Sequence, residues 1–486
     1  MPINSCLRLL IVVGLPFFLA GCNRAPAAAY AITHVNIVDV EAGIVRPDQT
    51  VVVTGHAISL VVASKDFVAP ASLKVIDSGG KFVIPGLWDM HMHFREANRD
   101  LKMDVANGVL GLRNLGGVVN EVFGLRYAIA HGEHTGPKIV ACGPIIDGPN
   151  SWSNPQFTIP VSSPDQARQA VDSLKKQGTD CIKVYDGLSR ESYFAIIAEA
   201  KRMDVPVVGH LPSAISVREA SNAGQRTLEH GLALAGGSTA EAEYVERRLD
   251  QSAFQEALRT RNFALIPAKI AGDETFMLDH FSQKLADETY SVLAKNQTFI
   301  TPTLVTQRAL TFIDDLDREA DPRMEYVSAD ERRSWKPENG MLTKYRTPEY
   351  IAMRKREYGR MLEEIPRVQR LGVHLLAGTD ITIPYTYPGF SVHDELALFV
   401  KAGLTPGEAL QTATTNPALV LGLSKQWGRV ATGYGANFVV LTADPLLDIA
   451  NTKKIDAVVL NGKLFDRSQL DQMLHDAKAV DSATAH

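Results

Sequence analysis

The chain has 486 residues, which is enough for one large α/β barrel and a smaller accessory domain. Its apolar fraction of 45% and charged fraction of 22% are ordinary for a folded globular protein and exclude a disordered or fibrous chain. Fifty basic and 55 acidic residues give a net charge of −5, so the chain lacks the basic surplus that nucleic-acid binding needs.

The first 22 residues have the pattern of an export signal. Arg8 precedes a nearly all-apolar run from Leu9 to Leu19, which is shorter than the ~20 residues that span a bilayer and is typical of a signal peptide. The run ends in Leu19-Ala20-Gly21-Cys22, which resembles a bacterial lipobox. We therefore expect lipidation of Cys22 and a short tether over residues 23–30, with no other membrane contact.

An ordinary secretory signal, cleaved among residues 25–29, is the alternative to a lipobox. Both interpretations predict an exported protein, and the first predicts a lipoprotein that faces the periplasm or the cell exterior.

Two cysteines, Cys142 and Cys181, remain in the part of the chain expected to fold. Both lie in short apolar runs typical of buried strands, and two cysteines make no disulfide framework. They could pair in an oxidising compartment, but buried free thiols are the commoner case and are the expectation.

Segments at both ends of the chain are rich in β-branched and turn residues. Residues 32–62 predict short antiparallel strands, and so do residues 437–441 and 457–464. These segments enclose a long middle, which is explained most simply by one small β-sandwich domain made from residues 31–82 and 425–470. Residues 471–486 are then a C-terminal tail.

The middle of the chain, residues 83–424, alternates short apolar runs with longer amphipathic stretches. This pattern predicts parallel strands joined by helices, and therefore an α/β fold of the (β/α)8 TIM-like barrel type. We expect the eight strands near residues 83–93, 109–114, 138–142, 181–185, 205–210, 227–230, 299–303 and 373–379. Residues 263–267 are an alternative for the seventh strand.

A long charged segment over residues 308–370 separates the seventh predicted strand from the eighth. It is longer than an ordinary connection and favours helix, so we expect an insertion that packs over the mouth of the barrel.

Two histidines and a lysine are the first candidates for chemistry. His91 and His93 end the first predicted strand, where the spacing i, i+2 points both side chains to the same face. Lys183 lies inside an apolar run, where an unpaired ammonium is disfavoured, so it either extends outward to solvent or is chemically engaged. A neutral lysine amine reacts with carbon dioxide to give a carbamate, whose two oxygens can bridge two metal ions.

Three further candidates, His210, His230 and Asp380, end other predicted strands. Barrel enzymes keep their active-site groups at this end of the strands. Taken alone, each of the six residues is explained more simply by a structural role. Four imidazoles, one amine and one carboxylate on one rim together predict a binuclear metal centre.

The sequence motifs around these residues resemble those of a known family. The segments 83–93, 377–380, 393–396, 403–410, 412–414 and 416–418 resemble the imidazolonepropionase-related branch of the amidohydrolase superfamily. The resemblance covers roughly residues 30–465, with Asn437 as a departure where the family usually has aspartate. Lys183 favours the lysine-bridged binuclear members, which are similar to Xaa-Pro dipeptidases.

The resemblance implies a ligand set for two divalent ions. One ion would take His91, His93 and Asp380, the other His210 and His230, and carboxylated Lys183 would bridge them together with a hydroxide. Imidazole and carboxylate suit Zn²⁺, with Mn²⁺ or Co²⁺ as alternatives.

The chemistry implied is hydrolysis of an amide or peptide-type C–N bond. Metal binding lowers the pKa of water from ~15.7 towards ~7, and Asp380 is the expected proton carrier to the leaving amine. The centre carries a charge of about +1, which tolerates an anionic small molecule such as a dipeptide or an N-acyl amino acid. Arg95, Arg113 and Tyr185 are candidate substrate contacts on the same rim.

Three other functions remain as alternatives. A lactone or phosphotriester hydrolase would use the same metals. A deaminase is disfavoured because Leu211-Pro212-Ser213 follow His210, where deaminases carry a glutamate. A non-catalytic scaffold is disfavoured because no expected ligand is missing.

Overall fold

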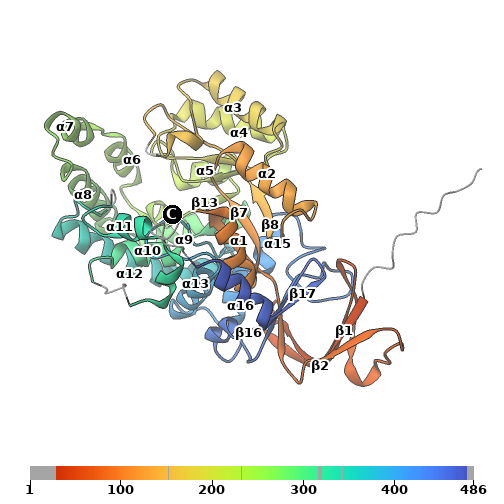
Figure 1. Ribbon diagram of the computed structural model, residues 1–486. Helices are drawn as coiled ribbons and strands as arrows, with labels where there is room; N and C mark the ends of the chain where they lie inside the picture. Colours follow the sequence, from red (N-terminus) through yellow and green to blue (C-terminus); the bar gives the residue numbers. More distant parts are fainter. Residues whose placement is uncertain (1–28, 152, 231, 316–319, 341–342, 479–486) are drawn as a thin grey trace, which may run out of the picture.

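The computed structural model describes residues 29–151, 153–230, 232–315, 320–340 and 343–478 (Figure 1). The predicted signal peptide, the lipidation site Cys22 and residues 23–28 of the predicted tether lie outside the described residues. Residues 29 and 30, which we expected in the tether, belong to strand β1 (Ala29–Asp39). In the described part of the chain, no helix is both long enough and apolar enough to cross a membrane.

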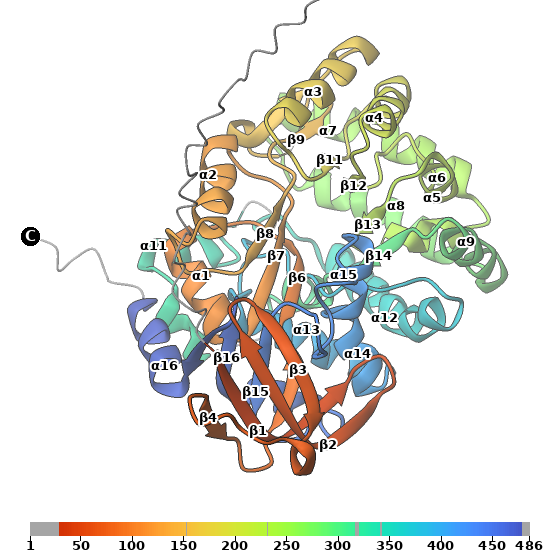
Figure 2. The same cartoon turned by 90° about the vertical axis from the view of Figure 1, so that its right-hand side faces the viewer.

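Both ends of the chain contribute to one eight-stranded sheet, as the sequence predicted (Figure 2). The strand order is β17-β16-β15-β5-β1-β2-β3, and β4 pairs with β1. The bounds are β2 (Ile44–Thr54), β3 (Ala57–Ala63), β4 (Lys74–Asp77), β5 (Phe82–Pro85), β15 (Phe438–Leu441), β16 (Ile455–Leu460) and β17 (Lys463–Asp466).

This sheet curls on itself, which differs from the β-sandwich that we expected. Ala57, the first residue of β3, forms an antiparallel bridge with Gly435, just before β15. The curl brings Val51 of β2 and Phe438 of β15 into one apolar core. A single curved sheet therefore encloses the core of the small domain, and the described residues form no second facing sheet there.

Strand β15 buries side chains on both faces because strand side chains alternate. Phe438 and Val440 belong to the core of the small domain, whereas Val439 and Leu441 belong to the large core of the α/β part. The two parts of the molecule thus share strands.

The middle of the chain forms parallel strands joined by helices. A three-stranded sheet has the order β6-β7-β8 and a six-stranded sheet has the order β10-β9-β11-β12-β13-β14. The bounds are β6 (Leu87–Met92), β7 (Val109–Asn114), β8 (Lys138–Ala141), β9 (Ile145–Asp147), β10 (Thr158–Pro160), β11 (Ile182–Val184), β12 (Val207–Gly209), β13 (Thr227–Glu229) and β14 (Phe299–Thr301).

The eighth predicted strand, residues 373–379, lies between β14 and β6. It has only isolated bridges, but Leu376 N donates to Ile300 O at 2.9 Å and Met90 N donates to Ala377 O at 2.8 Å. Gly378 passes so close to His91 that a Cβ at this position would lie 2.9 Å from its backbone nitrogen. The α/β fold is consistent with a TIM barrel, although its strands fall into two sheets rather than one closed sheet.

Helices cover these strands. Helix α3 shows why they form: Ser163 caps its amino end, Pro164 opens it, and its buried residues recur on one face. The bounds are α1 (Ala97–Ala106), α2 (Val119–Ala130), α3 (Pro164–Lys176), α4 (Arg190–Arg202), α5 (Val217–Ala223), α9 (Gln283–Lys295), α13 (Phe390–Lys401), α14 (Pro406–Thr412), α15 (Thr415–Val420) and α16 (Arg467–Asp476). Helix α16, which packs on α1, extends past residue 470, where we expected a tail.

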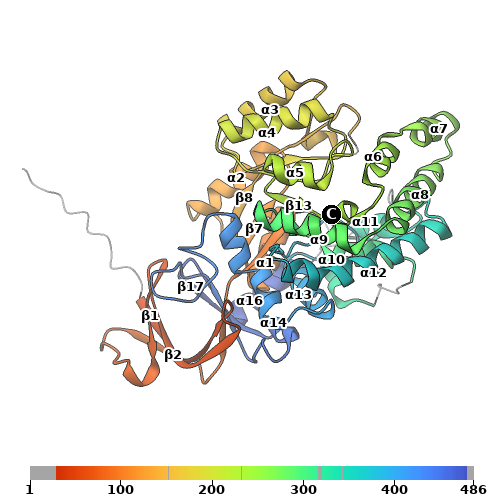
Figure 3. The ribbon, with the colours of Figure 1, turned by 180° about the vertical axis from the view of Figure 1, so that it is seen from behind.

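Two helical insertions stand at the end of the molecule opposite β1–β3 (Figure 3). The predicted insertion, residues 308–370, begins within α10 (Leu304–Thr311) and contains α11 (Ala329–Trp335) and α12 (Pro348–Arg370). A second insertion, between β13 and β14, contains α6 (Glu241–Leu249), α7 (Ser252–Thr260) and α8 (Leu265–Asp279). Residues 263–267, the alternative seventh strand, therefore run into a helix.

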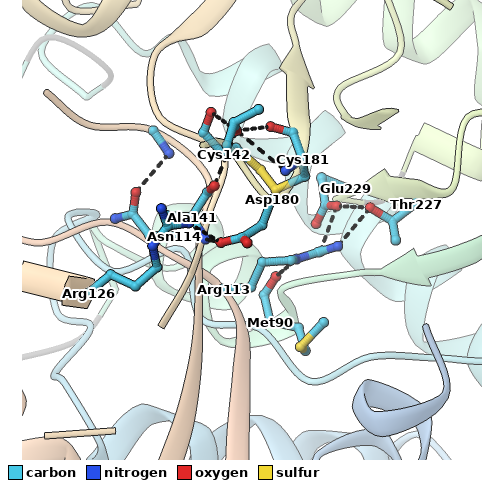
Figure 4. The surroundings of a disulfide bond; sticks show 12 residues. Met90, Arg113, Asn114, Arg126, Ala141, Cys142, Asp180, Cys181, Thr227 and Glu229 are labelled. Carbon is cyan, nitrogen blue, oxygen red and sulfur yellow. Dashed lines mark hydrogen bonds and ion pairs between the residues drawn. A yellow bond between two sulfur atoms is a disulfide. The ribbon is translucent and has the colours of Figure 1, made fainter. Parts of the chain in front are cut away.

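Cys142 and Cys181 form a disulfide, so the expectation of free thiols is wrong (Figure 4). Cys142 follows β8 and Cys181 precedes β11, and these strand ends lie side by side with a Cα–Cα distance of 4.5 Å. That distance suits a disulfide, and it depends on strand order rather than on sequence spacing.

Candidate active site

The six residues predicted as metal ligands line one cavity of about 1270 Å³. It opens at the carboxyl ends of the parallel strands, where barrel enzymes bind substrate. His91 lies in β6 and Lys183 in β11, and the other four follow a strand or the segment 373–379 directly. The cavity-lining ligand candidates are His91, His93, Lys183, His210, His230 and Asp380.

Three of these residues form a compact cluster that could hold a metal ion. One ligand atom each from His91, His93 and Asp380 lie within 4.8 Å of one another. Asp380 Oδ1 is 3.5 Å from His91 Nε2 and 3.7 Å from His93 Nε2. Asp380 has a φ of 50°, a left-handed conformation that turns its carboxylate away from the course of the preceding segment.

His210 and His230 form the second part of the cluster. Their Nε2 atoms are 3.0 Å apart, and the rings of His91 and His230 are 4.8 Å apart. His230 has a φ of 67°, so it leaves the β13 strand geometry. Two imidazole lone pairs at this distance repel one another unless a proton or a cation lies between them, which fits a metal ion bound by both.

Each of the four imidazoles is held through its Nδ1 atom. His91 Nδ1 donates to Glu229 at 2.9 Å, His93 Nδ1 to Gly116 O at 3.1 Å, and His210 Nδ1 to Asp186 at 3.1 Å. His230 Nδ1 contacts the Thr303 hydroxyl at 2.8 Å. These partners leave each Nε2 atom as the metal-facing nitrogen, which is the usual arrangement around protein-bound metals.

Three of the imidazoles, those of His91, His93 and His230, are held in the neutral form. Burial, followed by the positive charge of neighbouring groups, lowers the pKa of His91 and of His230 well below the ordinary value. Burial likewise lowers the pKa of His93. Neutral imidazole is the form that binds a metal ion.

Lys183 is the most unusual residue of the cavity. Its side chain is 1% exposed, and its Nζ atom is buried without a hydrogen-bond partner among the described residues. Burial lowers the pKa of this amine to about 8. Gly209 makes room for it, because a Cβ at this position would lie 2.9 Å from Lys183 Cδ. An orphaned buried amine between two groups of metal-ligand side chains fits a carbamate that bridges metals.

Arg113 does not lie where we expected. It is 2% exposed and absent from the cavity lining. Its guanidinium donates to Met90 O, Thr227 Oγ1 and Glu229 Oε1 (Figure 4), and also to Thr301 Oγ1. The prediction that it contacts substrate therefore does not fit the structure. Arg113 instead holds Glu229, the partner of His91.

Tyr185 and Arg95, the other predicted substrate contacts, both line the cavity. The Tyr185 ring lies 4.0 Å from the His210 ring. Arg95 donates to the carbonyls of Ile383 and Thr386 and lies 4.6 Å from the Trp335 ring. Arg346, a second arginine in the lining, was missed because nothing in its sequence surroundings distinguishes it from a surface arginine.

Curated relatives match short parts of the chain. A dihydroorotase from Pelobacter propionicus is 27% identical over 180 residues, which are 34% of this chain and 39% of that protein. An imidazolonepropionase from Deinococcus radiodurans is 40% identical over 88 residues, which are 18% of this chain and 22% of that protein. The chain spans about two fifths or less of the length of these relatives.

Solved structures match nearly the whole chain. A provisionally assigned prolidase from Bifidobacterium longum has a TM-score of 0.67 at 26% identity, covering 93% of this chain and 99% of that one. A Xaa-Pro dipeptidase with bound methionine in its active site has a TM-score of 0.66 at 19% identity, covering 90% and 100%. At that identity the second match shows the fold alone.

The sequence profile of the amidohydrolase family matches residues 82–465, which include every residue of the metal-ligand cluster. Proteins of this family generally bind divalent metals, and the His-His-Asp group described above is a possible site for one. The chain belongs to the amidohydrolase family.

Proposed function

We propose that this protein is a binuclear metal-dependent hydrolase. It cleaves an amide or peptide-type C–N bond in a small carboxylated substrate, such as a dipeptide or an N-acyl amino acid. One observation carries the proposal: the buried Lys183 Nζ atom, which has no hydrogen-bond partner among the described residues, shares its cavity with two groups of metal ligands. The prolidase and dipeptidase neighbours support this bond type.

Two divalent ions, in our proposal Zn²⁺, fit the ligands present. His91, His93 and Asp380 would hold one ion, His210 and His230 the other, and Lys183 as N6-carboxylysine would bridge them. When bound, such ions supply a water of lowered pKa as nucleophile and polarise the scissile carbonyl.

The side chains of the cavity would transfer the proton and bind the substrate. Asp380 is placed beside both His91 and His93, where its carboxylate can accept the proton of the attacking water and deliver it to the leaving nitrogen. Arg95 supplies a positive charge for the substrate carboxylate. Tyr185, whose ring lies 4.0 Å from the His210 ring at an interplanar angle of 33°, would close the cavity beside that imidazole.

Metal analysis with a Lys183→Ala variant tests the proposal. Protein expressed with zinc and bicarbonate should contain two metals per chain and hydrolyse an N-acyl amino acid or a dipeptide. The variant should lose at least one metal and fall in kcat at least about 1,000-fold, since it lacks the bridge that holds both ions. The exposed Lys295→Ala is the matched control. Full activity in the Lys183 variant, or fewer than two metals in the wild type, would refute the binuclear centre.

We also propose that the protein is exported and anchored by a lipid at Cys22. The disulfide between Cys142 and Cys181 supports an oxidising compartment, where such bonds persist. Cell fractionation of Cys22→Ala tests this proposal: the variant should leave the membrane fraction, and a variant that stays there would contradict the lipid anchor.

A further inference from the structure

The cavity is larger than a dipeptide needs. Its volume of about 1270 Å³ exceeds the ~300–1,000 Å³ typical of pockets for drug-sized ligands. The metal-ligand side chains line one part of it. Another part is apolar and aromatic, and its main residues, which we call the apolar wall, are Phe254, Phe263, Ile266, Ile270, Tyr345 and Tyr350.

The apolar wall comes from the two helical insertions rather than from the strands. Phe254 lies in α7, Ile266 and Ile270 lie in α8, and Tyr350 lies in α12. Helix α8 packs along α12, and the rings of Phe263 and Tyr345 lie 5.7 Å apart. The two insertions therefore form one continuous surface over the mouth of the active site, at the end that Figures 1 and 3 show opposite the small sheet.

Part of this wall is exposed although it is apolar. Ile270 is 41% exposed and Tyr345 is 38% exposed. Across the cavity, Val122 and Leu125 of α2 add further apolar lining. Exposed apolar side chains that gather in one cavity mark a binding site rather than chance exposure.

The charges of the cavity decide which part of a substrate lies on the wall. Arg95, two residues after His93, brings positive charge beside the metal-ligand side chains, which suits the carboxylate of the substrate. Arg346 lies against the Tyr350 ring of the wall and is paired with Asp314. The apolar wall is then left for the group on the other side of the scissile C–N bond, which is the acyl group.

We propose that the apolar wall is a subsite for a long aliphatic acyl chain, so that the preferred substrates are N-acyl amino acids with acyl chains of about eight carbons or more. This inference rests on the proposed hydrolase function. In the reaction, water adds to the amide carbonyl, the C–N bond breaks, and the proton moves to the leaving nitrogen. The products are a fatty acid and a free amino acid.

Kinetics with a chain-length series tests the subsite. The substrates are the N-acetyl, N-butanoyl, N-hexanoyl and N-octanoyl derivatives of one amino acid, with the corresponding glycyl dipeptide and N-benzoyl compound. We expect kcat/KM to rise about 2- to 4-fold with each buried methylene. Ile266→Ser and Phe263→Ser should flatten this rise. Leu249→Ser is the matched control, because Leu249 lies in the same insertion, 49% exposed and outside the cavity lining.

Three results would overturn the inference. They are a kcat/KM that does not rise with chain length, a rise that survives Ile266→Ser and Phe263→Ser, and an N-benzoyl compound preferred over the N-octanoyl one.

A binding measurement separates this inference from the proposed function. N-ethyl and N-octyl amino acids lack the scissile carbonyl, and calorimetry gives their Kd for the metal-loaded protein. Tighter binding of the N-octyl compound without hydrolysis of any amide would support the subsite and refute the hydrolase. Hydrolysis with equal Kd values would support the hydrolase and refute the subsite.

Discussion

Glu229 lies behind the candidate metal ligands and joins His91 to Arg113 and Thr227. It is fully buried, accepts from Arg113 at 2.8 Å and bonds His91 Nδ1 at 2.9 Å. The Thr227 hydroxyl donates to the same carboxylate. Its two oxygens therefore meet donors on both sides, and the position of His91 depends on them.

Replacing Glu229 by Gln should weaken metal binding without removing a ligand. The glutamine side chain has one amide oxygen and one NH2 group, and Arg113 and His91 Nδ1 both donate to this position. The NH2 group would face one of these two donors, which would then be buried without an acceptor. We expect metal affinity to fall about 10- to 100-fold, measured by competition with a chelator. The exposed Glu133→Gln is the control, and unchanged metal affinity in Glu229→Gln would show that His91 does not need this partner.

The side chains that meet in the cavity could be proposed from the sequence, but their hydrogen-bond partners could not. His210 and Asp380 have the right residue types and each follows an apolar run. The acceptors Gly116 and Asp186 belong to connections after other strands, so pairing them with His93 and His210 needs the strand order. Arg113 shows the same limit, because the sequence does not tell whether a cation at a strand end faces the cavity or the interior below it.

At the scale of elements, the disulfide lies at the border between the two parallel sheets. Cys142 follows β8 of the three-stranded sheet and Cys181 precedes β11 of the six-stranded sheet. A backbone hydrogen bond also joins the two sheets at this border: Asp180 N donates to Ala141 O at 2.9 Å. Since Lys183 lies two residues beyond Cys181, this border also positions the central residue of the site.

Removing the disulfide should destabilise the protein. The cysteines are 39 residues apart, and the chain-entropy treatment gives roughly 4 kcal/mol for a loop of that length. We expect the Cys142→Ala/Cys181→Ala variant to unfold at lower denaturant concentration than the wild type under oxidising conditions. In reducing buffer the two proteins should coincide. Equal midpoints under oxidising conditions would mean that the bond contributes nothing to stability.

Strands built from short apolar runs were predictable, whereas the helices of the second insertion were not. Strands such as β7 and β11 lie where their apolar runs predicted them. The segment 263–267 has a strand-like composition, but its continuation into α8 packs along α12 and becomes helical. Tertiary packing decides such short apolar runs, since their periodicity alone does not separate helix from strand.

At the scale of the whole molecule, the two ends of the chain and the middle form one structure. The sequence predicted that both ends build a small domain around an inserted barrel. The structure adds that β15 and β16 belong to both cores: Val439 and Val458 face the large core, and Phe438 and Val459 face the small one. β15 pairs with β5, which leads directly into β6 with His91.

The α/β part should therefore not fold without the ends of the chain. A protein of residues 83–424 would lack Val439, Leu441, Val458 and Leu460 and would expose the apolar surface that they cover. We expect it to aggregate or to bind no metal, as judged by size-exclusion chromatography and metal analysis. In the full chain, Val439→Asp should lower the unfolding midpoint and the metal content together, because one buried charge would disturb a strand that supports both cores. Leu447→Ser, at a position 85% exposed, should change neither. A monomeric fragment of residues 83–424 with two bound metals would show that the two parts are independent.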